Sequence, residues 1–155
     1  MRDLIAIGEG VTIYPVLRVA ACIIELSNKY GHMVSNLKLQ KLLYYVQAQF
    51  LLNYEEPCFP ESIEAWDIGP VVPVAYRKYA KYGGASIFRA DKEDIGYISP
   101  EDLAKIWSVV VSCADYTVAE LTKITQQETP WKKAYSPHKV NTISNESILA
   151  FVDEW

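Results

Sequence analysis

Length, composition and charge describe an ordinary single-domain globular protein of 155 residues, 50% of them hydrophobic and 22% charged. The formal net charge of −4 argues against non-specific binding to nucleic acid, which needs a basic surface. No apolar run approaches the roughly 20 residues that span a bilayer, and three widely spaced cysteines form no disulfide framework, so we expect a cytosolic, non-membrane protein.

Two helices are predicted in the first third of the chain. Pro15 suits the first turn of one helix, and Gly31 suits the position after its last turn. A second helix begins at Ser35 or Asn36 and reaches about Tyr54. Its apolar face is broad, which places this helix at the centre of the core. The main apolar stripe is Leu39, Leu42, Leu43, Val46 and Phe50.

The middle of the chain predicts a short strand, a tight turn and a third helix. The strand is Ser62–Trp66, and the turn is Asp67–Pro70, because a residue before proline is pushed out of helical geometry. In that turn, the glycine before the proline is expected to hold a conformation that a side chain would strain. The third helix begins at Pro73 and ends before Gly83. Its predicted inner face is Tyr76, Tyr79 and Ala80.

Local start signals predict four more helices. They are two capping boxes, Ser99–Asp102 and Thr117–Glu120, then Pro130, and finally Ser144 or Asn145. Together these elements predict a mainly α, compact single domain over residues 1–155. We expect at most a small two- or three-stranded β element.

Sequence signatures of catalysis and of cofactor or metal binding are missing. No zinc spacing or phosphate loop occurs, and His32 and His138 lie far apart, so we expect no metal and no cofactor. One alternative remains open, a small hydrolase or transferase that uses Glu64, Asp67 and a thiol. Cys58 lies between two prolines, where its thiol is expected to be exposed. A deep polar cleft would favour this alternative.

A second alternative is a nucleic-acid-binding protein. It would use Lys38, Lys41, Arg77, Lys78 and Lys81, the last three on one face of the third helix. A continuous basic face would favour this function. The net charge makes a solvated outer face the simpler interpretation, so binding to nucleic acid is not expected.

Aromatic residues are the more suggestive feature. Eleven tyrosines and four tryptophans exceed what a small core usually holds. Trp66 and Trp131 fall on no long apolar stripe, and each adjoins a turn or a proline. They suit a binding surface, where tryptophan and tyrosine are enriched. They equally suit a cluster that covers one end of the core, and both interpretations stay open.

Several segments together resemble a known family. They are Leu39–Tyr44, Glu64–Trp66, Gly69–Val71, Tyr76 and Pro130–Trp131. This order of segments resembles the Panacea domain, also called the SocA-like or phage-associated GepA-like family. The resemblance implies an antitoxin that binds a cognate toxin. One studied type is a proteolytic adaptor that delivers its toxin to a AAA+ protease, and the family brings no catalytic activity with it.

One position departs from the family pattern. Many relatives carry a histidine before the Pro-Trp pair, in T-H-x-E-x-P-W, whereas this chain has Gln126 there. Glutamine cannot titrate near neutral pH or replace imidazole as a base. The departure favours a structural or binding role for this segment.

The sequence and the resemblance together predict a cytosolic, non-enzymatic antitoxin that neutralises a toxin by direct contact. The segment Met1–Tyr14 is expected to be exposed and to add a strand or helix to the partner. The expected partner-binding residues are Trp66, Asp67, Gly69, Pro70, Tyr76, Arg77 and Trp131.

Overall fold

The structure is a computed structural model that describes residues 5–6 and 12–153. Its α-helices are α1 Val16–Lys29, α2 Asn36–Tyr54, α3 Pro73–Lys78, α4 Pro100–Cys113, α5 Val118–Gln126, α6 Thr129–Ala134 and α7 Asn145–Val152. Its strands are β1 Ile5–Ala6, β2 Thr12–Ile13, β3 Ile63–Trp66, β4 Gly69–Val71 and β5 Asn141–Ile143. Two 3-10 helices follow α3, namely η1 Ala80–Tyr82 and η2 Lys92–Asp94. The predicted mainly α fold with a small sheet is confirmed.

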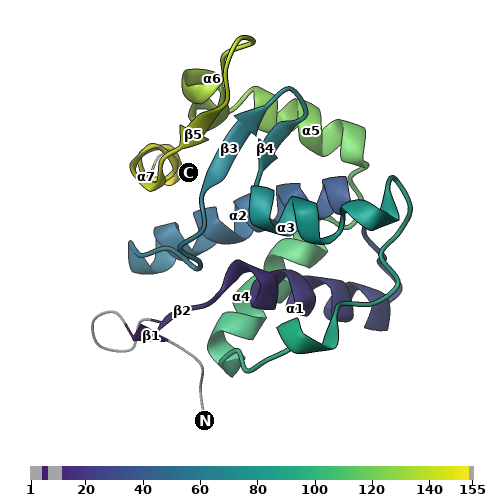
Figure 1. Cartoon of the computed structure of the whole chain (residues 1–155). Helices are drawn as coiled ribbons and strands as arrows, with labels where there is room; N and C mark the ends of the chain where they lie inside the picture. The colour runs from purple at the N-terminus through teal and green to yellow at the C-terminus, as the bar shows by residue number, and fades with distance from the viewer. Residues whose placement is uncertain (1–4, 7–11, 154–155) are drawn as a thin grey trace.

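The helix α2 lies at the centre of the arrangement. Figure 1 shows α2 crossing the middle of the molecule, with the sheet on one side and α1 and α4 on the other. The whole predicted apolar stripe is at most 1% exposed, and Leu43 is fully buried. Ser35 begins the helix, because its Oγ accepts the Lys38 N–H at 3.2 Å. The prediction of a central second helix is therefore confirmed.

The sheet has three antiparallel strands in the order β4-β3-β5. β3 and β4 form a hairpin in which Trp66 pairs with Gly69, so the turn consists of Asp67 and Ile68. β5 reaches β3 from far along the chain and pairs Asn141 with Ala65. The predicted strand at residues 62–66 is confirmed. The segment predicted as a turn through residue 70 instead contributes β4.

Polar side chains of α2 are buried along one face and bind the backbone of the segment that follows the helix. Asn36 Nδ2 donates to the Tyr76 carbonyl at 2.9 Å. Gln40 Oε1 accepts the Val72 N–H at 2.9 Å. Gln47 accepts the backbone N–H groups of residues 58 and 59 and donates to the carbonyl of residue 59. These bonds fix the path of the chain into β3 and out of β4 towards α3.

The predicted capping boxes differ in outcome. Thr117 and Glu120 form both reciprocal bonds, as expected. Ser99 caps α4 by accepting the Asp102 N–H at 3.2 Å. The Asp102 carboxylate points inward instead and accepts the hydroxyl groups of Tyr14 and Tyr54. Asp102 is 5% exposed, so these two tyrosines satisfy a buried carboxylate that the sequence had assigned to capping.

Several local predictions were wrong. The third helix ends at Lys78, and Ala80 is exposed because η1 turns it away from the predicted inner face. Cys58 is fully buried, not exposed. Tyr14 is buried as well, so the expected exposed N-terminal segment is wrong at its end, while its residues 1–4 and 7–11 lie outside the described residues. Among the described helices, none is long and apolar enough to cross a membrane.

Candidate functional site

The hairpin β3–β4 depends on Gly69. Its φ of +97° lies in the region that residues with side chains rarely adopt. A Cβ at this position would lie 3.0 Å from Lys41 Cε and 3.1 Å from Thr125 Oγ1. The expectation of a strained glycine in this turn is therefore confirmed, and the hairpin sits directly on α2 and α5.

Aromatic side chains from three elements surround the hairpin. The Trp66 ring meets Tyr76 of α3 edge to face at 5.1 Å, and its Nε1 donates to Glu64 Oε1 at 2.8 Å. Trp131 of α6 donates from Nε1 to the Trp66 carbonyl at 2.9 Å. Trp131 also stacks on Tyr135 at 4.4 Å. Because both indoles are half-buried and held by hydrogen bonds, they form a rigid, partly exposed aromatic face.

The tip of the hairpin is bonded through Asp67. Its exposed carboxylate accepts the Tyr135 hydroxyl, and this bond raises the pKa of Tyr135. Its backbone carbonyl accepts Gln126 Nε2 at 2.6 Å. Gln126 thus acts as a hydrogen-bond donor at the position where the family resemblance led us to expect a histidine. Sequence reasoning missed Tyr135, although its spacing of four from Trp131 on a helical turn was the available signal.

A cavity of about 430 Å³ opens between the hairpin and residues 135–140, which join α6 to β5. Trp66, Asp67 and Tyr135 line one part of it. His138 and Lys139 line another part and are exposed. A cavity of this size with aromatic walls and a polar rim can accept one or two side chains of a partner.

The predicted partner-binding residues divide by exposure. Trp66, Tyr76 and Trp131 are half-buried, and Asp67 and Arg77 are exposed, so these five are available for contact. Gly69 and Pro70 are buried. Their burial assigns them to support of the hairpin and not to direct contact.

Comparison with known proteins matches the part of the chain that contains the hairpin. The family model for the antitoxin SocA-like, Panacea domain matches residues 39–132, which contain the hairpin and all of the aromatic positions predicted as contacts. The chain belongs to this family.

A curated relative within the family is antitoxin SocA of Caulobacter vibrioides (strain NA1000 / CB15N). It is 46% identical over 63 residues, which are 40% of this chain and 34% of the relative. The alignment thus spans about a third of the relative's length. No solved structure gave a significant match.

Segments that carry the Panacea resemblance meet in space at the hairpin. Lys41, in the first of these segments, donates from Nζ to the Pro70 carbonyl at 3.1 Å. Trp131, in the last, bonds the carbonyl of Trp66 in the middle one. The quoted family segments therefore form one structural unit around β3 and β4.

The residues of the enzyme alternative are engaged elsewhere. Glu64 and Asp67 each accept a hydrogen bond from an aromatic neighbour, as described above. Burial raises the pKa of Cys22 to about 12, raises that of Cys58 well above its usual value, and raises that of Cys113. All three thiols are therefore protonated near neutral pH and poorly nucleophilic.

Two lysines named for the nucleic-acid alternative have structural contacts. Lys41 is fully buried. Lys38 Nζ donates to the carbonyls of Ala114 and Tyr116, at 3.3 and 2.8 Å, just beyond the last turn of α4. Its charge is thereby placed where the helix dipole favours a cation.

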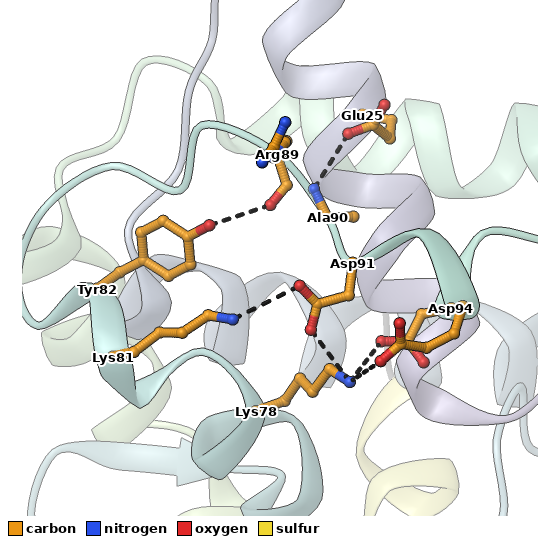
Figure 2. A network of polar contacts seen from close by, with 9 residues as sticks. Glu25, Lys78, Lys81, Tyr82, Arg89, Ala90, Asp91 and Asp94 are labelled. Atoms are coloured by element: carbon orange, nitrogen blue, oxygen red, sulfur yellow. Dashed lines mark hydrogen bonds and ion pairs between the residues drawn. The ribbon is translucent and has the colours of Figure 1, made fainter.

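Two further lysines are paired with carboxylates. Figure 2 shows Lys78 directed towards the carboxylates of Asp91 and Asp94. Its Nζ lies 3.1 Å from Asp91, 3.0 Å from Glu93 and 3.2 Å from Asp94. Glu93 and then Asp91 raise the pKa of Lys78. Lys81 lies 3.5 Å from Asp91. The continuous basic face that would have favoured nucleic-acid binding is therefore not found among the described residues, because these four lysines are buried, bonded to carbonyls or paired with carboxylates.

Proposed function

We propose that this chain is a cytoplasmic, non-enzymatic antitoxin that neutralises a cognate protein toxin by direct binding. The proposed contact surface is called the hairpin face and consists of Trp66, Asp67, Tyr76, Arg77 and Trp131. The observation that carries the proposal is the indole pair. Two tryptophans 65 positions apart are joined by a bond of 2.9 Å, are partly exposed and lie beside a cavity, within the segment that matches the antitoxin family.

Rigid aromatic side chains suit this role. Trp66 is held at Nε1 by Glu64 and against its ring by Tyr76, so little side-chain entropy remains to be lost on binding. Tryptophan and tyrosine anchors that fill a partner's pockets, or frame a pocket for a partner's side chain, dominate the energy of many interfaces. The cavity beside the hairpin gives such a side chain a place to bind.

Charge on α6 and on the segment after it supports an expectation about the chemistry of the toxin, since Lys139 lines the cavity and Lys132 and Lys133 shortly precede the lining segment in the sequence. Lys132, Lys133 and Lys139 are exposed, and none of them has an ion-pair partner within residues 12–153. Residues 129–140 contain no carboxylate. We therefore expect acidic side chains on the contacting surface of the toxin, which would speed association at low salt.

Delivery of the toxin to a AAA+ protease is a separate hypothesis that rests on the family resemblance. A degradation assay with toxin and protease tests it, since an adaptor must accelerate loss of the toxin. Unchanged toxin half-life with saturating antitoxin would leave direct neutralisation as the whole function.

The proposed function is tested with the product of the neighbouring gene, purified and titrated calorimetrically with this chain. Arg77→Glu should weaken binding by about tenfold or more, since a reversed charge at an interface is costly. Arg89→Glu is the matched control, because Arg89 is also exposed but lies outside the hairpin face. No binding by the wild-type chain, or equal losses in both variants, would contradict the proposal.

A further inference from the structure

A buried lysine lies beneath the hairpin face. Lys41 is 0% exposed, and among the described residues its Nζ has one hydrogen bond, to the Pro70 carbonyl at 3.1 Å. A Cβ added to Gly69 would lie 3.0 Å from Lys41 Cε, so the backbone of Gly69 rests on the end of this side chain. Thr125 Oγ1 of α5 would lie 3.1 Å from the same Cβ, so this residue also borders Gly69. The hairpin therefore forms part of the cover over this amine.

Within the part of the chain that the structure describes, no charged group compensates the amine. The hairpin brings Glu64 and Asp67, which are bonded to Trp66 Nε1 and to the Tyr135 hydroxyl. α5 brings Glu120 and Lys123, both exposed. Among the described residues no carboxylate lies within ion-pair distance of this amine.

Neighbouring titratable groups on α2 are bonded elsewhere or uncharged, and so is the nearby carboxylate of Glu128. Lys38 reaches away to the end of α4, and Tyr44 and Tyr45 are neutral phenols whose pKa values burial raises. Glu128 accepts the Tyr45 hydroxyl at 2.9 Å. Burial alone lowers the pKa of Lys41, from 10.5 to about 7.

We propose that Lys41 is a positioning residue whose neutral amine seats the hairpin on α2 and α5, and that proton uptake by this amine releases the hairpin. A neutral amine still donates to the Pro70 carbonyl, whereas an ammonium must stay in an apolar site with a single partner. Release of β4 lets water reach the amine. The hairpin face would then be held most firmly at alkaline pH and loosened progressively as the pH falls towards 7.

Proton linkage sets the size of the effect. The released state holds the amine in water with a pKa near 10.5, and the seated state holds it with a pKa of about 7. Between these values the released state carries one more proton. The ratio of released to seated hairpin should therefore fall about tenfold for each unit of rising pH.

Amide hydrogen exchange between pH 7 and pH 9 tests this without any partner. The probe is the Val72 amide at the end of β4, bonded to Gln40 Oε1. The observed exchange rate is the intrinsic rate multiplied by the fraction of molecules in which the hairpin is released. The intrinsic rate rises about tenfold per pH unit and the released fraction falls by the same factor, so the Val72 rate should stay nearly constant in wild type. In Lys41→Met the rate should rise about tenfold per unit, since the proton switch is gone.

Two controls separate this effect from others. The Ile87 amide, bonded to the Val34 carbonyl at 2.8 Å, lies outside the hairpin and should rise with pH in both proteins. Lys38→Met removes a lysine from the same helix and should leave the flat Val72 profile intact. If Lys41→Met does not fold, Lys41→Leu serves as the second variant for the same measurement.

Two results would overturn the proposal. One is a wild-type Val72 rate that rises about tenfold per pH unit, which would show no coupled proton. The other is a flat profile shared by Val72 and Ile87 in wild type, which would assign the proton to global unfolding. The wild-type profiles alone decide between these results and the expected one, and they do so whether or not a toxin binds the hairpin face.

Discussion

Replacement of Gln47 by leucine tests whether buried polar side chains of α2 hold the segment that leads into β3. Gln47 is 1% exposed, and its amide makes three bonds to backbone. Its Oε1 accepts the N–H groups of Cys58 and Phe59 at 2.8 and 3.2 Å, and its Nε2 donates to the Phe59 carbonyl at 2.9 Å.

The cost follows from the groups left behind. Leucine fills a similar volume but leaves two buried N–H groups and one carbonyl without a partner. Each such group costs about 1–3 kcal/mol, and local relaxation keeps the sum near the lower end, so we expect a loss of about 3–6 kcal/mol. That is a large fraction of the total stability of a domain, which is about 5–15 kcal/mol.

Urea denaturation followed by far-UV circular dichroism measures the loss. The matched control is Gln49→Leu on the same helix, because the hydrogen bond of Gln49 within the described residues goes to the exposed Asn53 side chain, at 2.6 Å. This control should change the free energy of unfolding by less than about 0.5 kcal/mol. Equal midpoints for Gln47→Leu and wild type would refute the role assigned to this buried amide.

Three further predictions concern the hairpin, its lysine and nucleic acid. Gly69→Ala should cost about 1–3 kcal/mol, from its φ of +97° and the close Lys41 side chain, whereas Gly84→Ala meets nothing within 4 Å. Thermal denaturation of the two variants compares them, and similar losses would contradict the assignment. Since the lowered pKa of Lys41 leaves the unfolded chain with more protons between pH 7 and pH 9, wild-type stability relative to Lys41→Met should rise by about 1 kcal/mol per unit. A constant difference would count against the buried amine. Random duplex DNA should show no appreciable binding near physiological salt, and a tight, salt-sensitive mobility shift would reopen that alternative.

The helices were predictable because their start signals are local. Ser35, Thr117 and Ser144 each bond the N–H three residues on, which the sequence displays directly. The strand β5 was not predictable in the same way. Its three residues pair with β3 from more than 70 positions away, and so short a segment has no period of its own.

Buried polar groups were the main failure of pattern reasoning. Apolar stripes identify which face of α2 is buried, but they do not reveal that Gln40 and Lys41 are buried as well, because their partners are backbone atoms of another segment. The aromatic signal at Trp66 and Trp131 did identify residues that lie together. The hydrogen bond from Trp66 to Glu64 and the stacking of Trp131 on Tyr135 had to come from the structure.

The most direct test of the central claim measures toxin affinity and unfolding free energy on the same Trp66→Ala protein. Trp66 is half-buried, so truncation should cost about 1–3 kcal/mol of stability, less than for a fully buried indole. If the hairpin face binds the toxin, the affinity of the folded fraction should also fall about tenfold or more. Lost stability with unchanged affinity of the folded fraction would contradict the account and leave the hairpin as an architectural feature.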